Sequence, residues 1–503
     1  MIVAAPGVFK GKLAPRAGRH PTGPYNRPVR RLPRLLALTL VLALASPPAA
    51  ARGLPRPVAE ALKAAAVPAT AVSVHVQGVD AKRPSLAWNP DRPMNPASAM
   101  KLFTTLAALE LLGPAYRWKT EVYVDGELAD GVLKGDLILK GYGDPKLDYE
   151  SFWLLLRALR GKGIREIEGA LVLDRSHFAP ANGDPGDFDG EALRPYNVLP
   201  DALLVHYKSL RFVFVPQPGR AGVHVYAEPH PPGLVLENRL ELSGGMCHEG
   251  RAFRAILRPT FEPGPPPRVV FDGRYPIECG EKDLNVALLP PDAQVAGIFR
   301  ELWTEMGGAW HGEARAGTLP PGARLLHTHE SAPLAEIVRD INKFSNNVMA
   351  RQLYLTLATS AYDPPAQPHQ AQQALRHWLN LKHIAAPELS IENGSGLSRT
   401  DRASAATLAE LLRAGWHSAA MPEFMASLPL AALDGTMKKR LLDEPVAGQA
   451  HVKTGLLSNA RAMAGYLLDA HGRRHVVVML INHPNAPDAE AANDALLRWV
   501  YER

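Results

Sequence analysis

The chain has 503 residues, of which 46% are hydrophobic and 21% are charged, a composition typical of globular proteins with several domains. Its formal net charge is +6, but residues 1–51 contain eight Lys and Arg residues and no Asp or Glu. The rest of the chain is therefore slightly acidic. This distribution argues against nucleic acid as a partner.

Residues 1–51 have the layout of a secretory signal. Three arginines at positions 30–34 precede the apolar run 35–45, and a stretch of alanines ending at Ala51 matches a cleavage site. The run is too short to span a bilayer, and no later segment is long enough either. We predict a cleaved signal peptide and at most peripheral membrane association. The long basic stretch before Val29 suggests a translation start further downstream.

The two cysteines, Cys247 and Cys279, are most simply a disulfide in an exported protein, the alternative being two separate buried thiols. Two cysteines without clustered histidines do not make a zinc site. The nearest metal-like cluster is His327-Thr-His329-Glu330, and we predict no metal there.

The first elements after the leader are two strands and a helix. Ala71–Val79 alternates apolar and polar residues, as a half-buried strand does, and Ser85–Asn89 is a short second strand. The helix that follows begins near Ser98 and ends near Leu112.

The middle of the chain alternates short strand-like segments with glycine-containing turns. Expected strands are Lys119–Tyr123, Val132–Leu133, Asp136–Lys140 and Gly169–Asp174, and expected helices are Phe152–Lys162 and Ala296–Met306. The prolines and glycines between Phe178 and Pro267 predict a small β-rich unit with long connections.

The last third is helical and then returns to strands. The expected helices are Ala335–Leu357, Pro368–Leu381, Ala405–Trp416 and Asp488–Tyr501, and the expected strands are Ala450–Lys453, Ala462–Leu468 and His475–Ile481. Three antiparallel strands at this end can complete a sheet with the two N-terminal strands. One domain would then be built from both chain ends, with the middle as an insertion.

Ser98 and Lys101 are two polar residues in an otherwise apolar helix start. Residues three apart share a helical face, so the hydroxyl and the amine can touch. A serine becomes a nucleophile when a neighbouring base takes its proton, and a desolvated lysine is such a base. The alternative is a capping serine followed by a lysine that extends to solvent.

Two further polar clusters have a functional and a structural interpretation. Ser345-Asn346-Asn347 can relay a proton and bind a substrate amide, or it can cap a helix. Lys453-Thr454-Gly455 can bind a carboxylate at a strand end, with glycine admitting an extended ligand, or it can be an ordinary charged strand end.

Taken together, Ser-x-x-Lys, Ser-x-Asn and Lys-Thr-Gly in this order are the motif set of serine β-lactamases and penicillin-binding proteins. The interval between Ser98 and Ser345 is far longer than in the plain fold. An insertion of that kind resembles the low-molecular-mass class C penicillin-binding proteins, the D-alanyl-D-alanine carboxypeptidase/endopeptidase family. Further stretches that resemble the family are Gly141-Tyr-Gly-Asp144-Pro145 and Asn393-Gly-Ser395-Gly396-Leu-Ser398-Arg399.

The resemblance implies an α+β fold in which an antiparallel sheet is flanked by helices and carries a large inserted, β-rich region. We expect a catalytic domain at 52–118 and 322–503. The insertion is then 119–321, with a nested β-rich subdomain at roughly 175–285. A periplasmic location is also implied.

The resemblance also implies the reaction. Ser98 would attack the D-Ala-D-Ala bond of peptidoglycan stem peptides and form an acyl-enzyme that water hydrolyses, and β-lactams would acylate the same serine. Lys101 would act as the base, Ser345 would pass a proton to the leaving amine, and Lys453 would tune Ser345. No metal or organic cofactor is implied.

Substrate binding is expected to involve Asn347, Thr454, Gly455, Leu456 and Arg399. Asn347 would hold the peptide amide, and Thr454, helped by Arg399, would bind the terminal carboxylate. The backbone N–H groups of Leu456 and of the nucleophile would form the oxyanion hole.

Two positions depart from the family pattern: Asn346 stands where Asp is common, and Leu456 where a small hydroxyl residue is usual. Neither removes a catalytic group, although both bear on rate and substrate preference. The alternative functions are a β-lactamase or esterase of the same fold and a non-catalytic cell-wall-binding scaffold. Retention of the biological role by the S98A variant would favour the scaffold.

Overall fold

The computed structural model describes residues 53–217, 219, 222–264 and 266–503. The predicted signal peptide therefore lies outside the described residues. Within the described ranges, no helix combines the length and the apolar character needed to cross a membrane.

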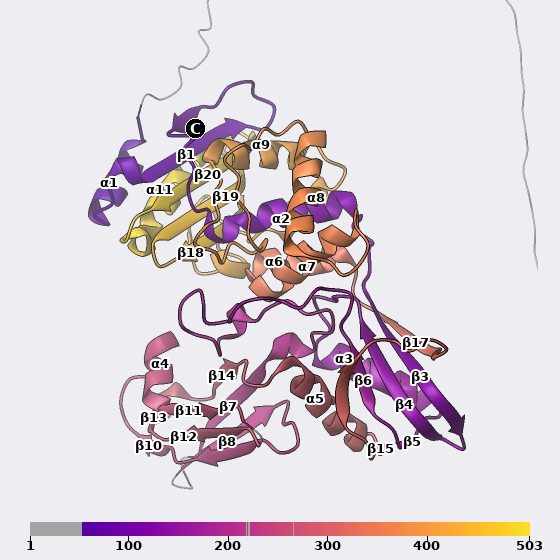
Figure 1. Cartoon of the computed structure of the whole chain (residues 1–503). Coiled ribbons are helices and arrows are strands. Elements are labelled where there is room, and N and C mark those ends of the chain that lie inside the picture. The colour runs from indigo at the N-terminus through magenta and orange to yellow at the C-terminus, as the bar shows by residue number, and fades with distance from the viewer. Residues whose placement is uncertain (1–52, 218, 220–221, 265) are drawn as a thin grey trace, which may run out of the picture. The chain divides into compact units, whose positions relative to one another are not determined.

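A five-stranded antiparallel sheet joins the two ends of the chain, as the indigo and yellow strands of Figure 1 show. Val74 pairs with Met479 on one side and with Trp88 on the other, so strands from opposite chain ends are neighbours. The strand order is β18 (Ala450–Leu457), β19 (Ala460–Leu468), β20 (Arg474–Asn482), β1 (Val72–Gly78) and β2 (Leu86–Trp88). The predicted α+β class is confirmed.

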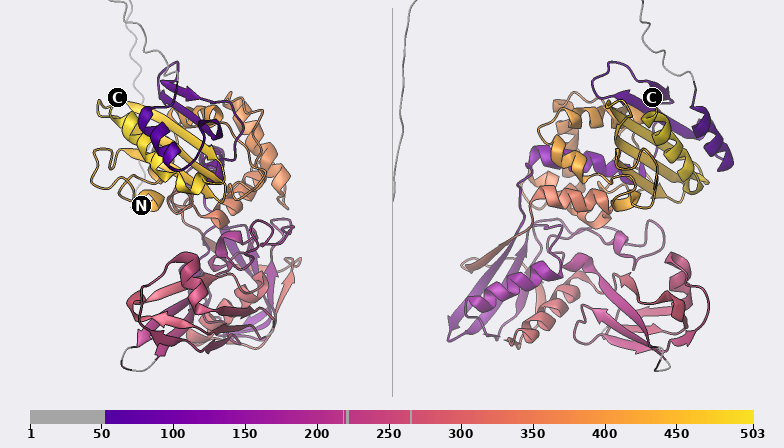
Figure 2. Two further views of the ribbon diagram at one scale, coloured as in Figure 1. Left: turned by 90° about the vertical axis from the view of Figure 1, so that its left-hand side faces the viewer. Right: turned by 180° about the vertical axis from the view of Figure 1, so that it is seen from behind.

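Helices cover both faces of this sheet (Figure 2). Val477 belongs to the core beneath α1 (Arg56–Ala64) and α11 (Glu490–Tyr501). Val478 belongs to the core beneath α9 (Ala405–Trp416). Because successive residues of a strand point to opposite faces, a sheet covered on both sides needs a nearly continuous apolar sequence, and β20 has one.

A cluster of helices completes this part of the protein. Its members are α2 (Lys101–Leu111), α6 (Leu334–Lys343), α7 (Asn347–Thr359), α8 (Pro368–Leu381) and α10 (Met421–Ser427). The sequence predicted one helix over 335–357, but the structure divides it, because Ser345 has a left-handed φ of 56°. The Asn346 side chain then caps α7 by accepting from the Met349 backbone nitrogen at 3.1 Å. The division places Ser345 in a turn rather than on a helix face.

The residues between the two halves of this domain begin with a long hairpin. Its strands, β3 (Lys119–Ala129) and β4 (Val132–Gly141), were predicted only as short pieces, because Gly126 and Gly135 resemble turn residues. In the structure the two glycines pair across the hairpin, and a Cβ on either would lie 2.7 Å from the Cα of the other. Only glycine permits this approach.

The hairpin belongs to a seven-stranded sheet covered by two helices. Its strands are β3 (Lys119–Ala129), β4 (Val132–Gly141), β5 (Glu166–Ile167), β6 (Leu171–Asp174), β15 (Ala309–Trp310), β16 (Ala314–Gly317) and β17 (Arg324–Glu330). The helices are α3 (Tyr149–Gly161) and α5 (Pro291–Glu305).

A smaller β-rich unit lies within this region and has its own apolar core. Its elements are β7 (Leu210–Gln217), β8 (Gly222–Glu228), β9 (Val235–Asn238), β10 (Glu241–Ser243), α4 (Gly250–Leu257), β11 (Pro259–Glu262), β12 (Arg268–Phe271), β13 (Arg274–Pro276) and β14 (Lys282–Val286). Its strands begin at Leu210, whereas residues 178–209 consist of loops and short turns.

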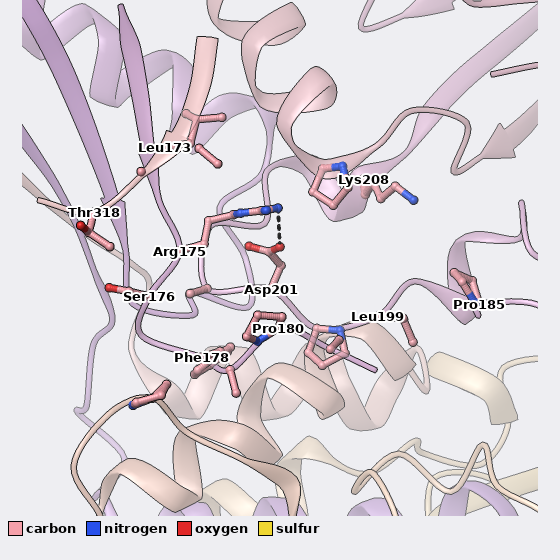
Figure 3. A pocket seen from close by; sticks show the side chains of 18 residues that line it. Leu173, Arg175, Ser176, Phe178, Pro180, Pro185, Leu199, Asp201, Lys208 and Thr318 are labelled. Atoms are coloured by element: carbon pink, nitrogen blue, oxygen red, sulfur yellow. Dashed lines mark hydrogen bonds and ion pairs between the residues drawn. The ribbon is translucent and has the colours of Figure 1, made fainter. Parts of the chain in front are cut away.

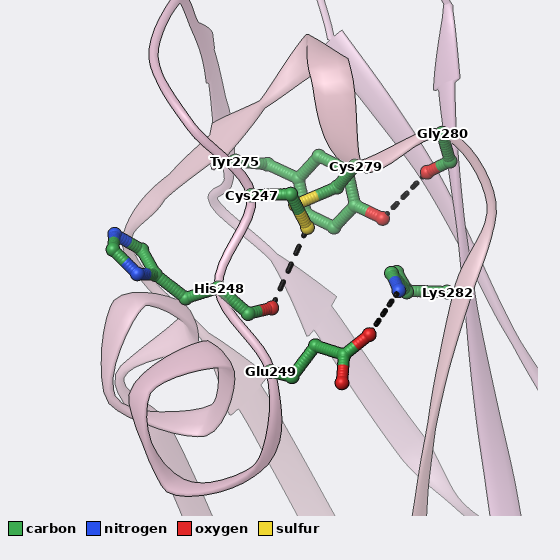
Figure 4. The surroundings of a disulfide bond; sticks show 7 residues. All are labelled: Cys247, His248, Glu249, Tyr275, Cys279, Gly280 and Lys282. Atoms are coloured by element: carbon green, nitrogen blue, oxygen red, sulfur yellow. Dashed lines mark hydrogen bonds and ion pairs between the residues drawn. A yellow bond between two sulfur atoms is a disulfide. The ribbon is translucent and has the colours of Figure 1, made fainter. Parts of the chain in front are cut away.

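Cys247 and Cys279 form a disulfide within this unit, with their Cα atoms 4.8 Å apart (Figure 4). The Tyr275 ring lies beside the bond, and its hydroxyl donates to the Gly280 carbonyl at 2.7 Å. The disulfide therefore closes the loop that contains α4.

Candidate active site

Ser98 lies in a single 3₁₀ turn, Ala97–Met100, directly before α2. The sequence predicted an ordinary helix start here, and the tighter turn has a consequence. Residues three apart eclipse one another in a 3₁₀ turn, so the side chain of Lys101 lies over that of Ser98. The Lys101 Nζ is 3.0 Å from the Ser98 Oγ.

Two glycines press against this turn from other segments. A Cβ on Gly396 would lie 1.9 Å from the Ala97 carbonyl oxygen, and a Cβ on Gly455 would lie 2.8 Å from the Ser98 backbone nitrogen. The expectation that Gly455 admits an extended ligand stays a prediction, and the structure shows a second use of this glycine. Its missing side chain makes room for the turn that carries the nucleophile.

Lys101 is fully buried and has three oxygen partners. Besides Ser98, its Nζ contacts the Asn347 Oδ1 at 2.6 Å and the Ser395 carbonyl oxygen at 2.5 Å. As an ammonium, Lys101 donates to all three. As a neutral amine it has two N–H donors for Asn347 and Ser395, and its lone pair then accepts the Ser98 hydroxyl proton.

The surroundings favour the neutral form. Burial lowers the pKa of Lys101 well below its usual value, and the nearby charges of Lys453 and Arg351 lower it further. The Asp401 carboxylate acts in the opposite direction. Lys101 is thus a buried amine whose neutral state contacts the serine.

A second lysine contacts the second serine. The Lys453 Nζ donates to the Ser345 Oγ at 2.8 Å and to the Thr454 carbonyl at 2.7 Å. Burial lowers the pKa of Lys453 to about 7. Near neutral pH Lys453 can therefore both release and accept a proton. Ser345 is the hydroxyl with which it can exchange that proton.

Two of the predicted motifs line one cleft of about 590 Å³, and the third reaches it through Leu456, which follows Gly455, and through the contact of Lys453 with Ser345. Ser98, Ser345, Asn347 and Leu456 all line it. The opposite wall comes from the loop region 178–209 and consists of Phe188, Asp189 and Tyr196. A bound ligand would therefore touch residues of the catalytic domain and of the insertion.

Arg399 also lines this cleft, but not where it was expected. Its guanidinium donates to the Ser458 Oγ at 3.1 Å and to the Phe188 carbonyl at 3.2 Å, and it lies over the Phe188 ring. At about 3.3 Å per residue, Ser458 is roughly 13 Å along the chain from Thr454. Arg399 therefore does not share a carboxylate with Thr454, as the sequence had suggested. Thr454 has a different neighbour, the Thr436 hydroxyl, at 2.7 Å.

Sequence reasoning missed several residues of the cleft. Ser395 acts through its backbone carbonyl, which no residue type reveals. Phe188, Asp189 and Tyr196 lie in irregular loops without periodicity. The stretch Asn393–Arg399 was noted as a family likeness, and that likeness is the signal that could have pointed to Ser395.

A larger pocket, of about 830 Å³, lies elsewhere and contains none of the predicted site residues. Figure 3 shows its lining, in which Arg175 pairs with Asp201 at 3.0 Å beside several prolines. A choice of the active site by pocket volume alone would therefore have selected a pocket without Ser98.

Comparison with known proteins identifies relatives along nearly the whole chain. Residues 54–502 match the family described as D-Ala-D-Ala carboxypeptidase 3 (S13). The chain is 25% identical over 441 residues to the D-alanyl-D-alanine carboxypeptidase DacB of Haemophilus influenzae, covering 83% of this chain and 86% of that protein.

Solved structures show the same fold. The crystal structure of penicillin-binding protein 4 (dacB) from Haemophilus influenzae matches with a TM-score of 0.72 at 23% identity, covering 89% of this chain and 99% of the other. The structure of that protein complexed with a β-lactam matches with a TM-score of 0.70, with the same identity and coverage.

Proposed function

The chain belongs to the D-Ala-D-Ala carboxypeptidase 3 (S13) family and is a serine-type D-Ala-D-Ala carboxypeptidase, and from this premise we propose which residues perform the reaction. Ser98 attacks the carbonyl carbon of the penultimate D-Ala in a peptidoglycan stem peptide. The terminal D-Ala leaves, and water hydrolyses the acyl-enzyme. The observation that carries this assignment is the contact of the Ser98 hydroxyl with the buried amine of Lys101 at 3.0 Å.

Lys101 is the general base. A base must be neutral before it can accept a proton, and keeping a lysine neutral near pH 7 requires a shift of about three pKa units, or ~4 kcal/mol. Burial and the neighbouring cations lower the pKa of Lys101, which is the direction required. The Asn347 Oδ1 and the Ser395 carbonyl hold the two N–H groups, so the lone pair is directed at Ser98.

Ser345 and Lys453 serve the leaving group. The departing amine needs a proton, and Ser345 donates its own while it recovers one from Lys453 at 2.8 Å. The left-handed backbone at Ser345 directs this hydroxyl from a turn between two helices into the cleft.

Asn347 and two backbone groups bind the acyl part of the substrate. Because the Asn347 Oδ1 is committed to Lys101, its Nδ2 is the group that faces a substrate carbonyl. The N–H groups of Ser98 and Leu456 form the oxyanion hole, where each donor is typically worth about 3 kcal/mol. The close approach at Gly455 supports this, because it brings β18 against the Ser98 backbone.

Thr454 binds the carboxylate of the departing residue, and Arg399 contacts the other end of the bound peptide. The contacts of Arg399 with Ser458 and Phe188 support the second role. We expect β-lactams to acylate Ser98, in keeping with the β-lactam complex of the Haemophilus influenzae protein.

Mass mapping of a penicillin adduct tests the assignment. Labelled penicillin should add one acyl group to the peptide that contains Ser98, and the S98A variant should lose it. The S176A variant, altered in the larger pocket, should label as the wild type does. A label on any other residue would contradict the assignment of the nucleophile.

We infer further that the protein is exported to the periplasm, that residues 1–51 are cleaved off as a signal peptide, and that any association with membranes is at most peripheral. Its catalytic domain comprises 52–118 and 322–503, with 119–321 as the insertion and a nested subdomain near 175–285. The sheet shared by both chain ends supports this division. N-terminal sequencing of the mature protein checks the cleavage site.

A further inference from the structure

Thr436 places a hydroxyl beside that of Thr454, and no role has been assigned to it in the reaction. It lies in the turn Gly435–Met437, and its Oγ1 is 2.7 Å from the Oγ1 of Thr454. Thr436 is exposed and Thr454 is half-buried, so a ligand can reach both. A bond between two hydroxyls uses only one of their two O–H donors, and the other is free for a ligand.

An ion pair fixes the Thr436 turn to the Ser345 turn. Lys343, the last residue of α6, is nearly buried and donates to both carboxylate oxygens of Asp434, at 2.8 and 2.7 Å. Gly435 packs on the same helix end, where a Cβ would lie 2.6 Å from the Lys343 carbonyl oxygen. The turn with Ser345 and the turn with Thr436 therefore form one wall. The spacing between the hydroxyls of these two residues is set by the fold before a ligand binds.

Positive charge lies next to this wall. The buried Lys453 Nζ bonds both to Ser345 and to the Thr454 carbonyl. A carboxylate that replaces the bond between the Thr436 and Thr454 hydroxyls can accept one hydrogen bond from each of them, and the protonated form of Lys453 complements its charge.

We propose that Thr436 binds the carboxylate of the departing D-Ala together with Thr454, and that it thereby determines the preference for substrates with a free C-terminus. The assignment rests on the proposed function, which makes Thr454 the carboxylate-binding residue of the motif. Thr436 would also replace the hydroxyl that is usual at position 456, because the side chain of Leu456 cannot donate to the second carboxylate oxygen.

The test compares two substrates, an N-acylated tripeptide that ends in D-Ala-D-Ala and its C-terminal carboxamide. A hydrogen bond to a charged group is worth roughly 10- to 100-fold in binding. In T436V, kcat/KM for the carboxylate peptide should therefore fall roughly 10- to 100-fold more than kcat/KM for the carboxamide. The T436S variant keeps a hydroxyl and should restore the wild-type ratio.

Two results would overturn the assignment of Thr436. One is wild-type kcat/KM on both substrates in T436V, and the other is an equal fold-loss on both, which a displaced Ser345 turn would produce; the ratio stays at its wild-type value in either case. Penicillin labelling of the wild type separates this failure from a broader one. If the wild type neither releases D-Ala nor is labelled at Ser98, the proposed function itself is wrong, and the assignment of Thr436 is wrong with it.

Discussion

Gly455 is a position where one added methyl group tests the geometry of the cleft. In the G455A variant the Cβ would lie 2.8 Å from the Ser98 backbone nitrogen and 2.9 Å from the Pro96 carbonyl oxygen. Both neighbours are backbone atoms, so no side-chain rotation relieves the overlap. Ordinary contact begins at 3.4 Å, so β18 and the Ser98 turn must separate by about 0.6 Å.

This separation acts on the nucleophile directly. A displacement of about 1 Å at reacting groups costs up to ~100-fold in rate. We therefore expect G455A to lower the second-order rate constant for acylation by penicillin about 10- to 100-fold. Overpacking of this kind also destabilises a protein by about 1–3 kcal/mol. Stopped-flow fluorescence with a labelled penicillin measures the first effect, and urea denaturation measures the second.

The matched control is G161A. Gly161 ends α3, and a Cβ there would meet no atom within 4 Å. This variant should acylate at the wild-type rate. If G455A does the same, β18 does not approach Ser98 as described, and the explanation of the nucleophile turn is wrong.

Three further predictions concern charge, the disulfide and the core. The D401N variant lacks the Asp401 carboxylate, whose charge raises the pKa of Lys101, so this pKa should fall. Because Lys101 must be neutral to act as the base, the acid limb of the pH–rate profile for acylation should move to lower pH. The C247S/C279S double variant opens the loop around α4 and should destabilise the smaller β-rich unit by about 3–4 kcal/mol in urea denaturation, with acylation unaffected. F103A removes a fully buried ring from α2 and should cost about 3–5 kcal/mol by the same measurement.

Each has an outcome that would contradict it. An acid limb that moves to higher pH in D401N would mean that Asp401 does not act on Lys101 through its charge. A loss of acylation in the cysteine variant would show that the smaller β-rich unit supports the cleft. A wild-type unfolding midpoint in F103A would contradict the burial of α2.

The sheet and its flanking helices could be predicted because the apolar residues of each segment recur with the period of a strand or of a helix. Ala405–Trp416 was expected as a helix and is one. The expected strand Ala71–Val79 is β1, Val72–Gly78, but it was predicted to be half-buried and in the structure both of its faces are buried. In both segments the apolar pattern and the local conformation agree, so tertiary contacts had little to change.

The left-handed turn at Ser345 was not predicted, although the helix cap considered for Ser345-Asn346-Asn347 is present and is formed by Asn346. A left-handed serine is costly by itself and persists only where the surroundings enforce it. Here they do, since Lys343 is held by Asp434 on one side and Asn346 caps α7 on the other.

The motif residues of the cleft were named from the sequence, but their partners were not. Ser395 contributes a carbonyl and Phe188 an aromatic wall from an irregular loop, and neither has a repeating pattern. Arg399 was expected beside Thr454 because both suit a carboxylate, but only the tertiary structure shows that they lie at opposite ends of the site.

The shared sheet has a consequence for when the enzyme becomes active. The turn with Ser98 is among the first parts of the described chain to be synthesised, but β18, which presses against it through Gly455, is among the last. The site around this hydroxyl therefore stays incomplete throughout synthesis, and it is completed only after β18, β19 and β20 have emerged and β20 has paired with β1. Loss of those strands, by an early stop codon or by a protease, would abolish acylation of Ser98 although Ser98 itself is unchanged.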